Sequence, residues 1–306
     1  MLYRTIILLI GLVLLHTSIV IPQSSNETFG KLISSEWLKQ NLDDPNLIIL
    51  HYGLKEDFEK EHIPNARLIS IRELIVNKEE GLHHELPDVE ILQSAITSWG
   101  INDNSKIVIC YPDENMFPVV ARLYFTLDYA GLGDVTSILN GGFPKWIDED
   151  LPVTSEVVNF EPCNFKIKIN ENILAQKEWI IDNLNNRNVV VVDARPEGQY
   201  SGDEEDHNSP RQGHIQRAVN IPFYNIMNDE SPSLIKEKSE LYKLFRENYI
   251  AENGVLVVYC GSGIWAAPIY FAARYLGYNV LFYDGSYQEW GNDYSLPVTG
   301  PVDLDN

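Results

Sequence analysis

The chain has 306 residues, enough for two domains of ordinary size, and 44% of them are hydrophobic, so cores can form. Its 44 acidic and 23 basic residues give a formal net charge of −21, and the acidic residues are spread along the chain. Because nucleic-acid binding needs clustered Lys and Arg, we exclude a nucleic-acid partner. We interpret the acidity as solubilising, and a small anionic substrate would need a local patch of positive potential.

Residues 1–23 have the pattern of a targeting segment. Arg4 precedes an unbroken apolar run over residues 5–15, which is typical of a secretory signal peptide. No clean Ala-x-Ala cleavage site follows, so an uncleaved N-terminal anchor is the alternative, although the run is short for a membrane span. In both cases we expect an extracytoplasmic protein that is secreted, periplasmic or anchored to the membrane only through this segment.

The first half of the chain alternates helical and strand patterns. In chain order, we predict a helix start at residues 34–38, a buried strand at 47–50, a charged section rich in loops up to Pro87, a helix at 88–99, a buried strand at 106–110, a helix at 119–129, a strand near 135–139 and a turn at 140–143 before Trp146.

Much of this pattern recurs about 145 residues later in the chain. The matching pairs are Trp37 and Trp179, residues 47–50 and 189–192, His62-Ile63 and His214-Ile215, and residues 106–110 and 255–259. We therefore predict a tandem duplication, with a first domain at 30–154, a linker at 155–172 and a second domain at 173–300. Strands that alternate with helices predict an α/β fold in each half, with a mainly parallel sheet flanked by helices.

Residues 254–277 form the stretch that most strongly suggests chemistry. A buried strand at 255–259 leads into Cys260, then Gly261-Ser262-Gly263, and a helix from Ala266 that Gly277 should end. The loop N–H groups and the positive end of the helix would stabilise a thiolate, lower its pKa and make it a nucleophile. The alternative is that Cys260 is a small core residue and that the glycines only make a turn.

The corresponding loop of the first half lacks these features. Tyr111 takes the place of the nucleophile, and the longer loop after it carries Asp113 and Glu114 but no glycine. We interpret this half as non-catalytic, with Cys110 in its core and Cys163 as incidental. Three cysteines cannot all pair, and no Cys or Cys/His spacing indicates a metal site, so we expect no metal and no cofactor.

The order and duplication of these motifs resemble the tandem-domain rhodanese family of thiosulfate and 3-mercaptopyruvate sulfurtransferases. The resemblance covers about residues 31–300, and its markers are the two His-Ile motifs, the stretch Asn140-Gly141-Gly142-Phe143 with Trp146, Val192-Asp193-Ala194-Arg195, and Cys260-Gly261-Ser262-Gly263. It implies two rhodanese-like domains, with the active thiol only in the second. It also implies that Cys260 takes a sulfane sulfur from a small anionic donor, 3-mercaptopyruvate or thiosulfate, and passes it as a persulfide to a thiol or cyanide acceptor.

The resemblance also suggests the residues of the site. Cys260 is the catalytic residue, and the loop Gly261, Ser262, Gly263, Ile264, Trp265 and Ala266, similar to that of the mercaptopyruvate branch, would bind the substrate. Ser262 would hydrogen-bond the substrate or relay a proton, or serve only as a turn residue. Arg195 would bind a carboxylate or sulfonate, or else form an ion pair with Asp193. His62 is a further candidate, although such histidines more often tie loops together.

Two departures from the family pattern favour another function. Trp265 stands where the family has a small threonine, and Gln199 stands where it has a second substrate-binding arginine. The alternative is an extracytoplasmic sulfur carrier or interaction module without efficient turnover. Phosphatase chemistry on the same fold needs an arginine six residues after the cysteine, and Ala266 occupies that position.

Overall fold

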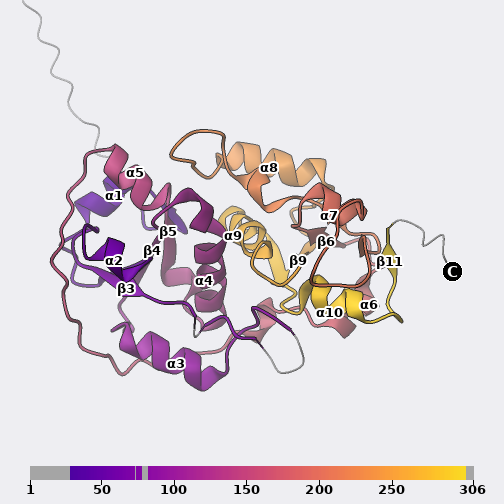
Figure 1. Cartoon of the computed structure of the whole chain (residues 1–306), viewed down its shortest axis with the longest axis horizontal. Coiled ribbons are helices and arrows are strands. Elements are labelled where there is room, and N and C mark those ends of the chain that lie inside the picture. The colour runs from indigo at the N-terminus through magenta and orange to yellow at the C-terminus, as the bar shows by residue number, and fades with distance from the viewer. Residues whose placement is uncertain (1–27, 73, 78–81, 301–306) are drawn as a thin grey trace, which may run out of the picture.

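The computed structural model describes residues 28–72, 74–77 and 82–300. The predicted targeting segment, residues 1–23, lies outside this part of the chain. Within the described ranges, no helix combines the length and the apolar character needed to cross a membrane. Each half of the chain forms an α/β unit, and the two units lie side by side (Figure 1).

The sheet of the first half has five strands, and all of its pairings are parallel. The strand order is β1-β5-β4-β2-β3, with bounds Leu32–Ile33 for β1, Leu47–Tyr52 for β2, Ala66–Ile69 for β3, Lys106–Cys110 for β4 and Thr136–Leu139 for β5. The helices of this half are α1 (Ser35–Gln40), α2 (Lys55–Phe58), α3 (Val89–Ser98), α4 (Phe117–Tyr129) and α5 (Gly142–Asp148), with 3-10 turns η1 (Glu114–Met116) and η2 (Gly133–Val135).

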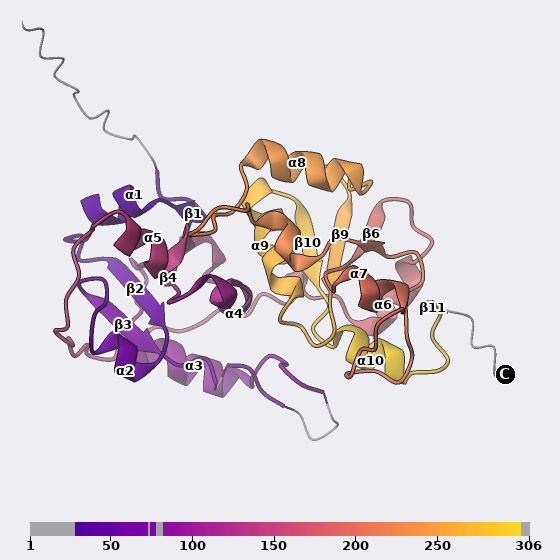
Figure 2. The ribbon, with the colours of Figure 1, turned by 45° about the horizontal axis from the view of Figure 1, so that its top comes forward.

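The second half repeats this arrangement. Its parallel sheet has the order β10-β9-β6-β8, with β6 at Val189–Asp193, β8 at Val219–Asn220, β9 at Val255–Tyr259 and β10 at Asn279–Phe282, and a short antiparallel pair joins β7 (His214–Ile215) to β11 (Val298–Thr299). The helices are α6 (Lys177–Asn183), α7 (Glu197–Ser201), α8 (Lys238–Glu247), α9 (Ala266–Leu276) and α10 (Ser286–Asn292), with 3-10 turns η3 (Glu171–Ile173) and η4 (Phe223–Ile226). Helices flank both sheets (Figure 2), so the predicted fold class is confirmed.

The position of Cys260 follows from the strand order. In the second sheet, the chain adds β8 on one side of β6 and then β9 and β10 on the other side, so the direction in which strands are added changes between β6 and β9. Cys260 comes directly after β9. The carboxyl ends of two such neighbouring strands leave an opening where ligands of α/β proteins bind. The first sheet reverses at the equivalent pair, β2 and β4, and Tyr111 follows β4 there.

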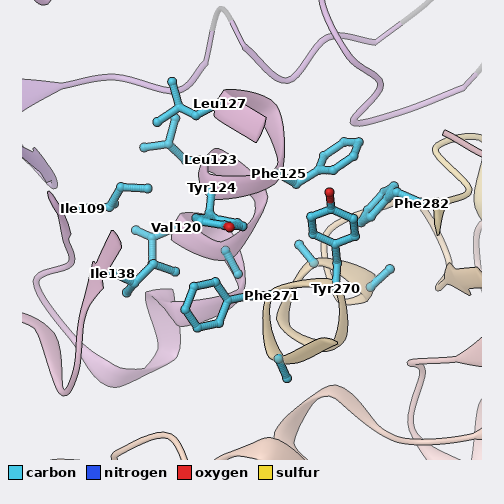
Figure 3. Close-up of a cluster of buried hydrophobic side chains, with 14 of the residues drawn as sticks. Ile109, Val120, Leu123, Tyr124, Phe125, Leu127, Ile138, Tyr270, Phe271 and Phe282 are labelled. Atoms are coloured by element: carbon cyan, nitrogen blue, oxygen red, sulfur yellow. The ribbon is translucent and has the colours of Figure 1, made fainter. Parts of the chain in front are cut away.

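The two halves share one hydrophobic core. Helices α4 and α9, which follow the equivalent strands β4 and β9, pack against each other through aromatic rings (Figure 3). The rings of Tyr124 and Phe271 meet edge to face at a centroid distance of 4.9 Å, and those of Phe125 and Tyr270 at 5.2 Å. Such aromatic pairs stabilise a contact beyond the free energy of the apolar area that they bury. This contact therefore holds the two halves in their relative position.

His51 is a buried imidazole near the carboxyl end of β2. Its ring packs edge to face against Phe58 and Phe143, and its Nδ1 has no hydrogen-bond partner among the described residues. Burial, with a smaller contribution from the charge of His62, lowers the pKa of His51 from 6.5 to about 4. The folded protein therefore keeps this ring neutral at pH values where the unfolded chain protonates it.

We expect this histidine to make the protein less stable as the pH falls. Above pH 6.5 the ring is neutral in both states, and His51 does not lower the free energy of unfolding. As the pH falls to 4, the unfolded chain binds a proton that the folded protein does not, which lowers the free energy of unfolding by about 3 kcal/mol. His51→Leu should remove this contribution and flatten the dependence of the unfolding free energy on pH. Urea denaturation of both proteins across this range measures it, and parallel losses in both would contradict the prediction.

Candidate active site

The loop after β9 surrounds the Cys260 sulfur with main-chain N–H groups. Gly263 donates its N–H to Sγ at 3.1 Å, and the N–H groups of Ser262, Trp265 and Ala266 are also directed at the sulfur. Gly263 has φ +90°, and a Cβ there would lie 3.0 Å from Arg122 Nη1, so the turn requires glycine. The expected ring of amides is therefore present at the N-terminus of α9.

The expected lowering of the thiol pKa is wrong for this structure. Cys260 is only 2% exposed, and its burial raises the pKa above the ordinary value, although the surrounding N–H groups act in the opposite direction. Desolvation of a fully buried thiolate thus outweighs the amides. Burial raises the pKa of Cys110 much further, to a value that leaves it a neutral core residue.

A histidine of the first half contacts this loop. His84 Nδ1 lies 2.8 Å from Ser262 Oγ, although the two residues are 178 positions apart. Burial, followed by the charge of Arg122, lowers the pKa of His84, so its ring is neutral near pH 7 and its free nitrogen lone pair can accept the Ser262 hydroxyl proton. The structure therefore gives Ser262 a partner for proton transfer that the sequence analysis missed.

An ion pair between the halves holds the segment that carries His84. Asp284, just after β10, accepts a hydrogen bond from Arg122 of α4 at 2.6 Å and one from the Leu86 N–H at 2.8 Å. Arg122 is fully buried and lies within 3.5 Å of the Gly263 carbonyl oxygen. Gln288 adds two hydrogen bonds to the main chain of His83, each 2.9 Å long. The first half thus closes over the Cys260 loop.

Arg195 forms the ion pair that the sequence analysis named as its alternative role. Its guanidinium is fully buried and contacts Asp193 at 2.5 Å and Asp206 at 2.9 Å. It also donates to the Gly213 carbonyl oxygen at 2.7 Å, and it lies 4.0 Å above the ring of Tyr287. The arginine therefore links strand β6 to the loop at residues 202–213. Substrate binding by Arg195 would require it to leave these partners, and it stays a prediction.

The sequence matches a known family model twice, once in each half. The model for the rhodanese-like domain matches residues 34–149 and 176–293. The chain belongs to the rhodanese-like family. The first matched segment contains β2, β3, β4 and β5 of the first sheet, and the second contains all four strands of the second parallel sheet, so each unit is a rhodanese-like domain.

Several sulfurtransferases resemble the chain over most of its length. The 3-mercaptopyruvate sulfurtransferase of Mus musculus is 29% identical over 86% of this chain and 93% of that protein. The thiosulfate sulfurtransferase of Rattus norvegicus is also 29% identical, over 86% of this chain and 92% of that protein. These relatives support sulfur transfer as the general activity, and their equal similarity does not distinguish the two donors.

Solved structures share the fold. The structure of SseA from Escherichia coli, described as a 3-mercaptopyruvate sulfotransferase, matches with a TM-score of 0.71 and 24% identity, over 84% of this chain and 99% of that one. A complex of EanB with ergothioneine matches with a TM-score of 0.76 and 22% identity, over 89% of this chain and 70% of that one. At this level of identity, the two matches establish the arrangement of the rhodanese-like domains and no substrate.

His62 ties loops together within the first rhodanese-like domain. Its Nδ1 lies 2.6 Å from the Phe58 carbonyl oxygen, its Nε2 lies 3.2 Å from that of Glu156, and its ring stacks on Phe58. His214 makes the equivalent contact in the second domain, with Nδ1 2.8 Å from the Tyr200 carbonyl oxygen. These contacts give His62 a structural role, and a catalytic role for it stays a prediction.

Trp265 forms one wall of the loop. Its ring is half-buried and stacks on Phe223 of η4 at a centroid distance of 5.1 Å and an angle of 16°. Phe223 in turn meets Tyr224 edge to face at 5.3 Å. The bulky side chain is therefore accommodated by aromatic packing at the N-terminus of α9, next to the half-buried Ile264.

Proposed function

We propose that this protein transfers a sulfane sulfur from 3-mercaptopyruvate or thiosulfate to a thiol or cyanide acceptor, with Cys260 as the sulfur carrier. The observation that supports it most is the ring of N–H groups around Sγ at the N-terminus of α9. Such groups stabilise negative charge on sulfur. The sulfurtransferase relatives support the same general activity.

The reaction has two displacement steps. The Cys260 thiol first gives up its proton to solvent. The thiolate then attacks the transferable sulfur of the donor, a new S–S bond forms, and the C–S bond of 3-mercaptopyruvate or the S–S bond of thiosulfate breaks with its electron pair on pyruvate or sulfite. The terminal sulfur of the persulfide remains as an anion within reach of the loop N–H groups. An acceptor thiol then forms a bond to this outer sulfur and gives up its proton to it, and the S–S electron pair returns to Cys260 as a thiolate.

Ser262 should matter for one donor and not for the other. Pyruvate leaves as a carbanion equivalent that must gain a proton, whereas sulfite leaves without one. Because Ser262 Oγ lies 2.8 Å from His84 Nδ1, the pair can move that proton. For Ser262→Ala we expect kcat with 3-mercaptopyruvate to fall about 100-fold, a typical contribution of acid–base catalysis, and kcat with thiosulfate to change much less. Equal losses with both donors would indicate a structural role for Ser262.

Mass spectrometry of the donor-treated protein tests the function and the site together. We expect the peptide that contains Cys260 to gain the mass of one sulfur atom, and cyanide should remove it. The peptides with Cys110 and Cys163 provide internal controls, since Cys110 is buried in the first domain and Cys163 lies in the linker. The proposal fails if no peptide gains sulfur or if the gain falls on one of these two.

The sulfur-carrier alternative makes a different kinetic prediction. A carrier without efficient turnover would take up one equivalent of sulfur and release product only once, whereas an enzyme continues in the steady state. The enzyme relatives do not favour this alternative. The extracytoplasmic location stays a proposal, supported by the sequence of residues 1–23.

A further inference from the structure

The first domain has a cavity of about 1140 Å³ at the carboxyl edge of its sheet. The residues that end β2 and β3 line it, together with the segment after β4 and the start of α5. In this sheet the direction of strand addition changes between β2 and β4, so the cavity lies at the position that the Cys260 loop occupies in the second domain. It is large enough for a small organic molecule, since such sites typically have volumes of roughly 300–1,000 Å³.

The cavity lies where the second domain holds Arg195. The last residue of β4 pairs with His51, and the last residue of β9 pairs with Asp193, so His51 occupies the position of Asp193. Two residues further along each strand end, Gly53 stands in the position of Arg195. The glycine places no side chain into this space, and both His51 and Gly53 line the cavity.

Phe143 forms a second side of the cavity and corresponds to Tyr287. Its N–H donates to the Tyr111 carbonyl oxygen at 2.8 Å, as the Tyr287 N–H donates to that of Cys260 at 2.9 Å. In the second domain, Arg195 lies 4.0 Å above the Tyr287 ring, which is fully buried. The Phe143 ring is only half-buried and lines the cavity. The first domain therefore offers an aromatic surface where the second domain has an ion pair.

His51 supplies the buried polar group of this cavity. It is 3% exposed, and its Nδ1 has no hydrogen-bond partner among the described residues. The other edge of the ring, with Nε2 and Cδ2, lies 3.3 Å from the place that a Cβ on Gly53 would take. A buried polar group without a partner costs free energy, and a ligand that forms a hydrogen bond with it recovers part of that cost.

The charged side chains around the cavity balance one another. Three cationic and three anionic side chains, all exposed, line it: Lys55, Lys60, Arg72, Asp57, Glu61 and Asp113. The less exposed lining is largely apolar and includes Leu68, Ile69 and Met116. A charged ligand would lose hydration here without meeting an excess of opposite charge, so the cavity favours an uncharged molecule.

We infer that the first domain binds an uncharged aromatic molecule with a hydroxyl group, a phenol, in this cavity. Phe143 and Met116 offer ring–ring and sulfur–ring contacts to its aromatic part. A hydroxyl both donates and accepts hydrogen bonds, so it can pair with either nitrogen of the neutral His51 ring. A phenol also stays uncharged at neutral pH, because its pKa is roughly 10. The inference is independent of the sulfur chemistry at Cys260.

A cycle of two ligands and two proteins measures the hydrogen bond to His51. Equilibrium dialysis gives the dissociation constants of 4-phenylphenol and 4-methylbiphenyl, in which a methyl group replaces the hydroxyl. Comparing their ratio between the unmodified protein and His51→Leu cancels the difference in hydrophobicity between the ligands. We expect the relative preference for the phenol to fall about fivefold or more in His51→Leu, the effect of one hydrogen bond between neutral groups. An unchanged ratio would overturn the inference.

Three controls test the chemistry and the place of binding. His207→Leu makes the same substitution at a histidine of the second domain whose side chain is 87% exposed, and it should leave the ratio unchanged. Biphenyl-4-carboxylate has the same rings and a negative charge, and it should bind about tenfold more weakly than the phenol or worse. Met116→Trp should fill part of the cavity and weaken the binding of both uncharged ligands. Stronger binding of the carboxylate, or unchanged binding in Met116→Trp, would contradict the inference.

The methionine methyl groups report where the phenol binds. Met116 lines the cavity, whereas Met227 follows η4 in the second domain. With carbon-13 in the methionine methyl groups, the NMR signal of Met116 should shift when 4-phenylphenol is added, and that of Met227 should stay in place. A shift at Met227 alone, or no shift under saturating phenol, would overturn the inference. Sulfur loading of Cys260 should proceed normally in His51→Leu, so this inference and the proposed function can fail separately.

Discussion

Cys260→Ser should abolish thiocyanate formation from cyanide with either donor, a loss of at least about 1000-fold in kcat. A serine hydroxyl at this position cannot hold the transferred sulfur, and losses of this order are usual when a nucleophile is removed. The fold should be unaffected, because the side chains have similar sizes and the Gly263 N–H can still meet an acceptor there. Thiocyanate is measured colorimetrically under saturating donor, and circular dichroism checks the fold.

A substitution of the other buried cysteine serves as the control. Cys110 ends strand β4 in the core of the first domain, and burial holds its pKa far above the range in which a thiol reacts. Cys110→Ala should therefore keep most of the activity. Retained turnover in Cys260→Ser, or a complete loss in Cys110→Ala with an intact fold, would show that the assignment of the carrier is wrong.

Arg122→Met should produce the largest loss of stability among the changes considered. It leaves Asp284 without its ionic partner at the junction of the domains, where Arg122 is fully buried and the Asp284 side chain is 14% exposed. Breaking such a pair on one side typically costs about 3–5 kcal/mol, because one charge remains desolvated. The midpoint of urea denaturation should fall accordingly, and the segment with Leu86 and His84 should become more accessible to hydrogen exchange.

Two further variants check this explanation. Arg122→Met/Asp284→Asn removes both charges and should recover part of the lost stability, since the amide oxygen can still accept the Leu86 N–H. Lys60→Met breaks the exposed pair with Asp57 and should leave the midpoint nearly unchanged. If the double variant is as unstable as Arg122→Met, the lost packing of the arginine side chain explains the effect better than the unpaired charge.

The features that could be predicted from the sequence are local ones. The strand at 255–259, the turn through Gly263 and the end of α9 at Gly277 depend on residues close together in the chain, and the structure confirms them. The duplication could be predicted because the same order of strand patterns and motifs occurs in both halves of the sequence. The strand order then brings Cys260 to the carboxyl edge of the second sheet.

The parts of the site that could not be predicted depend on contacts between distant segments. His84 reaches Ser262 from the other domain, and no nearby pattern marks it beyond its place in a loop rich in charged residues. The pKa of Cys260 was predicted in the wrong direction because its burial is a property of the packed domain and not of the loop. The sequence could not decide between substrate binding and an ion pair for Arg195, since its second partner, Asp206, lies in a loop with no regular pattern.

The contact between α4 and α9 joins two helices that occupy the same place in the two repeats. It therefore has the geometry of a self-complementary interface, of the kind that two-fold homodimers use, within a single polypeptide. Joining the copies covalently makes their association independent of protein concentration. It also frees the two copies from having to be identical, so that one repeat can carry the thiol while the other supplies side chains, such as that of His84, that contact the loop around it.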